Sequence, residues 1–70
     1  MQLNIIAKAN SFEEISQLVQ NHFGEPMRLI QMNMSMFEQY QIRPIAKIWI
    51  KEIWKYRVVV KDGVYIFGRV

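Results

Sequence analysis

The feature that most constrains the fold of this chain is an Asp-Gly dipeptide, Asp62-Gly63, between two runs of β-branched and aromatic residues. This dipeptide favours a two-residue type I′ turn, which joins neighbouring antiparallel strands. We therefore predict a β-hairpin over residues 57–70. A two-residue loop sets its register, pairing Val60 with Tyr65, Val59 with Ile66 and Val58 with Phe67.

The predicted hairpin is apolar on both faces. One face carries Val58, Val60, Tyr65 and Phe67, and the other carries Val59, Val64 and Ile66. A single helix covers only one face of a sheet, so the second face needs another explanation. We predict that Val59, Val64 and Ile66 form a surface for self-association or for a protein partner.

A helix is expected over residues 11–23. Ser11 and Glu14 have the spacing of a capping box, in which the side chain of each residue accepts a hydrogen bond from the backbone amide of the other. Gly24 suits the left-handed position after the last turn, and Pro26 prevents the helix from resuming. The apolar residues Phe12, Ile15, Leu18, Val19 and Phe23 recur with helical period along one side.

Strands are predicted on both sides of this helix. Leu3 to Ala9 is the first, and apolar and polar residues alternate from Met27 onward, with a turn or a strand end expected near residues 37–41. This alternation places Met32, Met34 and Met36 in the core beneath the helix.

Residues 44–56 fit two interpretations. A helix beginning at Pro44 is permitted, but its apolar residues would cover about two-thirds of the circumference. The alternation and the Ile and Trp content favour a strand. An unbroken strand from Arg43 to Lys61 would span roughly 60 Å, so we expect it to bend or break near Glu52.

These elements predict an α+β fold. The expected order is β-α-β-β-β, an antiparallel meander with one helix packed on one face, in a single domain over residues 1–70.

The composition excludes several classes of protein. The chain contains no cysteine and one histidine, so we expect no disulfide, metal or other cofactor. No apolar run approaches the roughly 20 residues that cross a bilayer, and the N-terminus lacks the basic region of a signal peptide. We therefore expect a cytoplasmic protein that does not bind membranes.

Enzyme signatures are missing from the sequence. The three glycines are far apart, and neither Ser11 nor Ser35 has triad spacing with His22. The expected function is therefore non-enzymatic binding. A chain of this size is marginally stable without disulfides or metals, which makes oligomerisation an expected source of stability. We predict a homo-oligomer or a subunit bound to a protein partner.

The cations gather in the second half of the chain. Residues 1–42 contain two cations and four acids, whereas residues 43–70 contain seven cations and two acids. Six of the seven have odd numbers between Arg43 and Lys61, so a regular strand would place them on one face. This segment supports an alternative function, nucleic-acid binding, although lysines also protect solvated sheet edges. Its candidate residues are Lys47, Trp49, Lys51, Lys55 and Arg57.

Overall fold

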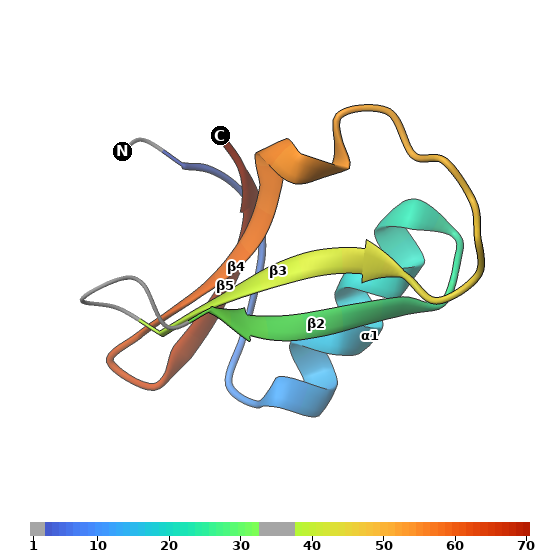
Figure 1. The fold of residues 1–70 in the computed structure, drawn as a ribbon. Coiled ribbons are helices and arrows are strands. Elements are labelled where there is room, and N and C mark those ends of the chain that lie inside the picture. The colour runs from blue at the N-terminus through green and yellow to red at the C-terminus, as the bar shows by residue number, and fades with distance from the viewer. Residues whose placement is uncertain (1–2, 33–37) are drawn as a thin grey trace.

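In the computed structural model, which describes residues 3–32 and 38–70, one helix packs against one face of a five-stranded antiparallel sheet (Figure 1). The predicted α+β architecture is therefore confirmed, with one strand more than expected. The elements are β1 (Asn4–Ala9), α1 (Phe12–Phe23), β2 (Met27–Met32), β3 (Glu38–Pro44), the 3-10 helix η1 (Ile53–Lys55), β4 (Tyr56–Lys61) and β5 (Val64–Arg69).

Helix α1 has the predicted ends. The Ser11 side chain accepts a hydrogen bond from the backbone amide of Glu14 at 3.1 Å, and Gly24 adopts the left-handed conformation, with φ of 71°. The Glu14 carboxylate accepts a hydrogen bond from the backbone amide of Asn10, one residue before the expected partner. Both ends of the helix are thus capped by local residues, as the sequence predicts.

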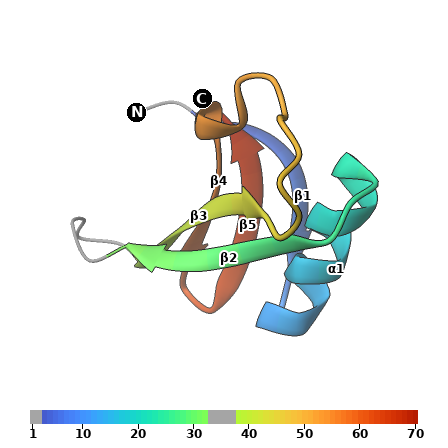
Figure 2. The ribbon, with the colours of Figure 1, turned by 45° about the vertical axis from the view of Figure 1, so that its right-hand side comes forward.

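The strand order is β1-β5-β4-β3-β2, and the predicted hairpin is confirmed with its register. Both turn residues have positive φ, 52° at Asp62 and 78° at Gly63, as a type I′ turn requires. Strands β2 to β5 form a meander, and β1 closes the far side by pairing with β5. Figure 2 shows how strongly the strands turn across the sheet while α1 stays on one side.

The core lies between α1 and the sheet. Ile15 and Val19 of the helix share one buried cluster with side chains from all five strands, and the 45–55 segment contributes Ile50 and Ile53 at the edge of the core. The fully buried strand side chains of this core are Ile42, Val58 and Phe67, which come from β3, β4 and β5.

Three sequence-based predictions are wrong. Residues 44–56 are neither one strand nor an α-helix: β3 ends at Pro44, and η1 follows a segment without regular structure. Glu52 has a left-handed backbone, with φ of 56°, so the chain does break where its length required. Residues 38–41 lie within β3, although a turn or a strand end was expected at 37–41; Phe37 lies outside the described residues.

The third error is the side of β2 that enters the core. Met27 and Leu29 pack against the core, whereas Ile30 is exposed and Met32 is half-buried on the opposite face. Both faces of β2 carry apolar residues, so alternation alone selected the wrong one. Met34 and Met36 lie outside the described residues.

Candidate functional site

The face of the sheet opposite α1 is not covered by that helix (Figure 1). We call it the open face. Residues directly opposite one another on antiparallel strands point to the same side, so the register defines its members. One row across all five strands is Ile30, Gln41, Arg57, Gly68 and Ile5, and the next is Met32, Gln39, Val59, Ile66 and Lys8. Further pairs are Arg28 with Arg43 and Lys61 with Val64.

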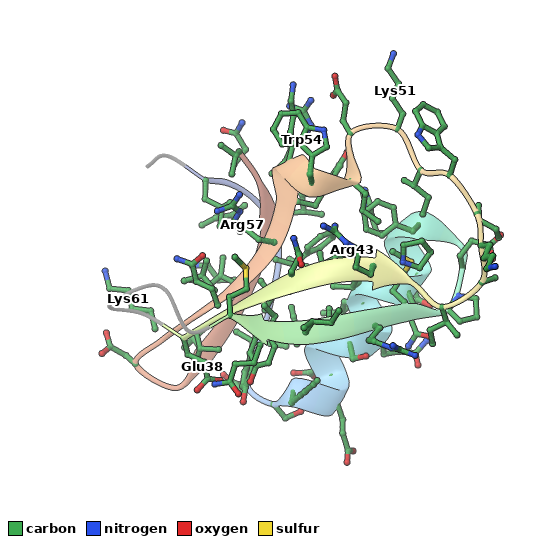
Figure 3. The ribbon with its side chains drawn as sticks, in the orientation of Figure 1. Glu38, Arg43, Lys51, Trp54, Arg57 and Lys61 are labelled. Carbon is green, nitrogen blue, oxygen red and sulfur yellow. The ribbon has the colours of Figure 1, made fainter. Side chains whose placement is uncertain are left out.

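Five of the nine Lys and Arg residues of the chain lie on this open face, and none of its strand residues is acidic. Four strands contribute: β1, β2, β3 and β4. Figure 3 shows Arg43 on β3, with Arg57 and Lys61 along β4. The complete set of cations is Lys8, Arg28, Arg43, Arg57 and Lys61. The strand positions of the open face therefore carry positively charged and no negatively charged side chains.

Two of these cations lie directly opposite each other, Arg28 on β2 and Arg43 on β3. Like charges at such positions destabilise an antiparallel pair. The Arg43 guanidinium donates a hydrogen bond to the backbone carbonyl of its neighbour Ile42 at 3.1 Å, which does not neutralise its charge. An anion bound between the two arginines would relieve this repulsion.

Acids occupy other parts of the molecule. Glu13 and Glu14 lie in the first turn of α1, where they favour the positive end of the helix dipole. Glu38, on the helix side of β3, accepts a hydrogen bond from the Tyr40 hydroxyl at 2.6 Å. That bond, with burial and the Glu38 charge, raises the pKa of Tyr40 to about 12. Glu13, Glu14 and Glu38 thus lie on the helix side of the sheet, away from the basic open face.

Val59, Val64 and Ile66 all lie on the open face, and all three are half-buried. Val59 is directly opposite Ile66, Lys8 adjoins Ile66 on β1, and Lys61 is opposite Val64. These apolar side chains are therefore surrounded by cations, which the sequence pattern did not indicate.

The predicted basic site is divided by the fold. Arg57 lies on the open face, whereas Lys47, Trp49 and Lys51 lie on the exposed segment before η1. Lys55 lies within η1, where its Nζ atom is 3.4 Å from Glu52. The structure brings Arg57 together with Lys8 and Arg28, two cations that were not among the candidates. The alternation of β2 contained the signal for Arg28, but the inverted face assignment obscured it.

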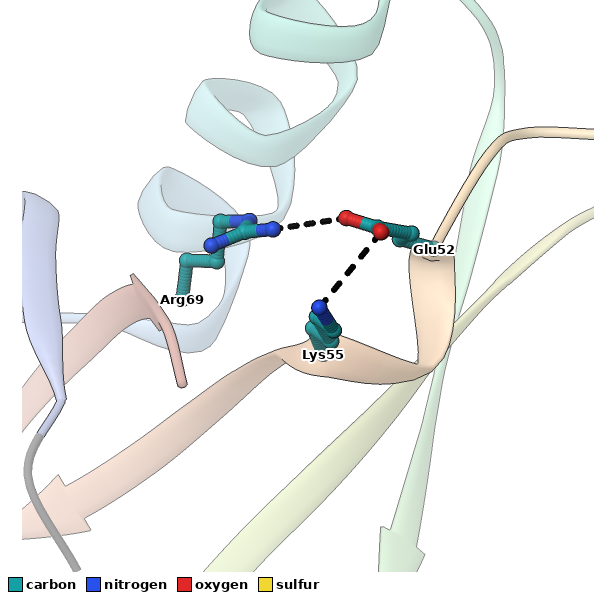
Figure 4. Close-up of polar contacts among 3 residues, drawn as sticks. All are labelled: Glu52, Lys55 and Arg69. Atoms are coloured by element: carbon teal, nitrogen blue, oxygen red, sulfur yellow. Dashed lines mark hydrogen bonds and ion pairs between the residues drawn. The ribbon is translucent and has the colours of Figure 1, made fainter.

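One ionic cluster fixes the end of the molecule next to the open face (Figure 4). Glu52 binds Arg69 through Oε2 at 2.6 Å and Lys55 through Oε1 at 3.4 Å. The hydrogen bond from Arg69, and then the charge of Lys55, hold the pKa of Glu52 below its usual range. Arg69 also lies over the ring of Tyr56, with Cζ 5.9 Å from the ring centroid.

Within residues 3–32 and 38–70, no group of three or more His, Asp or Glu side chains could hold a metal ion. No helix in the same ranges is long and apolar enough to cross a membrane. The chain matches no protein-family model, no curated protein and no solved structure.

Proposed function

We propose that this protein is a non-enzymatic binding protein whose open face binds nucleic acid. The observation that carries the proposal is the set of five cations from four strands, with no acid at any strand position of that face. Phosphate backbones are the polyanions that such a surface attracts, because each cation that contacts a phosphate releases a counterion.

The repulsion between Arg28 and Arg43 supports a role for these residues outside folding. Their direct opposition weakens the contact between β2 and β3, so packing does not explain the pair. A phosphate between two guanidinium groups would accept hydrogen bonds from both, and arginine suits this geometry. Gln41 lies one row away on the same face and provides an amide that both donates and accepts hydrogen bonds.

Self-association through the open face is the competing function. A symmetric dimer there would bury Val59, Val64 and Ile66 of each copy, but it would also bring Lys8, Arg57 and Lys61 of both copies together. Like charges at an interface cost several kcal/mol. An anionic partner avoids this cost, so the charge distribution favours nucleic acid over a second copy. Self-association stays a prediction that light scattering at several salt concentrations tests.

The experiment is fluorescence anisotropy with a labelled single-stranded 20-mer, titrated with protein over a series of salt concentrations. For single strands, the slope of log affinity against log salt is about −0.7 for each phosphate contact. Arg28→Gln with Arg43→Gln removes two contacts and should reduce the slope by roughly 1.4. Affinity at low salt should fall at least tenfold.

The matched control is Asn10→Asp with Gln17→Glu. Both residues are exposed, Gln17 lies on α1 and Asn10 lies just before its N-cap residue Ser11, and this pair changes the net charge by the same amount. Its effect on affinity should be small. If the two double variants lost the same amount of affinity, net charge alone would account for binding. No binding by the wild-type protein at low salt would refute the proposal.

A further inference from the structure

The segment between β3 and β4 exposes large apolar side chains in a fixed arrangement. The exposed fractions are 57% for Ile45, 40% for Ile48, 82% for Trp49 and 63% for Trp54. Within the same segment, Ile50 and Ile53 pack against the core. Because Ile53 anchors η1 from the inside, its neighbour Trp54 is held outward.

The Glu52 cluster fixes Trp54 further. The left-handed backbone of Glu52 starts η1, whose Lys55 amide donates a hydrogen bond to the Glu52 carbonyl at 2.9 Å. The bond between Arg69 and Glu52 ties this turn to the end of β5, and the amide of Val70 donates to the Lys55 carbonyl at 2.7 Å. Lys55 Nζ lies 5.3 Å from the Trp54 ring centroid. A tryptophan presented in this way keeps its ring available without a large ordering cost on binding.

Trp54 also lies close to β3 and β4, two strands that contribute cations to the open face. It lies three residues before Arg57, and η1 lies against β3, the strand that carries Gln41 and Arg43. Figure 3 shows Trp54 and Lys51 projecting from the end of the molecule beyond Arg43 and Arg57. A strand whose phosphates follow Arg43 and Arg57 would therefore meet an exposed indole and a further lysine at this end.

We infer that Trp54 stacks on a base of the bound nucleic acid and makes the site selective for single strands. The inference rests on the proposed function and adds the class of nucleic acid. Aromatic side chains stack on unpaired bases regardless of sequence, whereas the bases of a duplex are already stacked on their neighbours. An acidic protein would also be attracted by the cations, but it has no unpaired bases on which Trp54 could stack.

The test compares the affinities for a single-stranded oligothymidine and for a duplex of equal length. Trp54→Ala should weaken single-strand binding roughly 5-fold to 100-fold, the usual effect of losing one stacked base. Duplex binding should change little, because the phosphate contacts remain. Trp54→Phe should retain much of the preference for single strands. The salt slope should stay unchanged in both variants, since neither removes a cation.

Trp49→Ala is the matched control, because Trp49 lies on the same segment and is more exposed than Trp54. It should leave the ratio of single-strand to duplex affinity unchanged. The Trp49→Phe protein keeps Trp54 as its one tryptophan, and single strands should quench its fluorescence through stacking. Quenching of Trp49 alone, seen in Trp54→Phe, would refute the assignment to Trp54.

The failures of the two proposals are distinguishable. Suppose that Arg28→Gln with Arg43→Gln abolishes salt-dependent binding, while single-stranded and duplex DNA bind with equal affinity and Trp54→Ala changes neither affinity. This result would refute the stacking role of Trp54 alone. The proposed function would then stand. Binding to neither form at low salt would refute both.

Discussion

Arg28 and Arg43 are direct partners across strands β2 and β3, on the face of the sheet that no helix covers. Two cations in this position repel each other, and no acid occupies any strand position of that face. The same two side chains therefore lower the stability of the folded protein and contribute to the positive charge of the open face.

Arg28→Gln should stabilise the protein. Removing one of the two opposed charges relieves a repulsion worth about 0.2–1 kcal/mol, which urea denaturation would measure. Added salt should narrow the difference from the wild-type protein, because it screens exposed charges. Lys61→Gln is the control, since Lys61 is opposite the neutral Val64. A less stable Arg28→Gln protein would contradict the proposed repulsion.

Ile42→Ala should destabilise the protein by about 2–5 kcal/mol, because a fully buried side chain is replaced by a cavity. Ile30→Ala removes the same atoms from the neighbouring strand β2, where the side chain is exposed on the open face. Its effect should be much smaller. Urea denaturation of both variants tests which side of the sheet holds the core. Similar losses would mean that the open face is buried by an unseen partner.

Tyr40 should titrate above the ordinary range of tyrosine, with a pKa of about 12. The Tyr40 hydroxyl donates a hydrogen bond to the Glu38 carboxylate at 2.6 Å, so ionisation of Tyr40 breaks this bond and creates a second negative charge beside the first. Because the pKa is raised in the folded state, this contribution to stability is complete below the ordinary tyrosine pKa. It is lost as pH rises through 12.

Near-ultraviolet absorbance during an alkaline titration measures this ionisation. Glu38→Gln should lower the pKa of Tyr40 toward the ordinary value, and Tyr40→Phe should remove the late step. An unchanged late step in Tyr40→Phe would assign it to another tyrosine.

Glu52 contributes stability with the opposite pH dependence. Its pKa is lowered in the folded state, chiefly by the hydrogen bond from Arg69, so the contribution is present above the pKa of the unfolded chain. It disappears as pH falls through the folded value. Glu52→Gln should therefore unfold at lower urea concentration than the wild-type protein at pH 7, and the two midpoints should converge in acid. A constant difference across this range would exclude ionisation of Glu52 as the cause.

Gly68→Ala should loosen the edge strand β1. A Cβ atom at this position would lie 2.6 Å from Leu3 Cγ and 2.7 Å from the Asn4 carbonyl oxygen, so the chain before and within β1 must move. Overpacking of this kind costs about 1–3 kcal/mol. Hydrogen exchange of the β1 amides should accelerate more than that of β3.

Gly63→Ala is the contrasting variant. A Cβ atom there meets no neighbour within 4 Å, but φ of 78° disfavours it by about 1–2 kcal/mol. Global stability should fall, without selective opening of β1. If the β1 amides exchanged selectively faster in both variants, β1 would be the least stable strand regardless of the substitution.

Local sequence signals determined the elements that short-range chemistry controls. The cap at Ser11, the left-handed Gly24 and the turn at Asp62-Gly63 were all predicted, because each depends on neighbouring residues alone. The hairpin register followed from its loop length. The architecture, one helix on one face of an antiparallel sheet, followed from these elements together.

Only the tertiary structure decided which faces are buried and how the cations gather. Both sides of β2 are apolar enough for a core, and the choice of Met27 and Leu29 depends on how β3 and α1 meet that strand. The segment before η1 resembled a strand because its alternate residues are apolar, yet it leaves the sheet and anchors through Ile50 and Ile53. Arg28 and Arg43 are fifteen positions apart in the chain. They become partners through strand pairing, a long-range contact that periodicity within either segment does not encode.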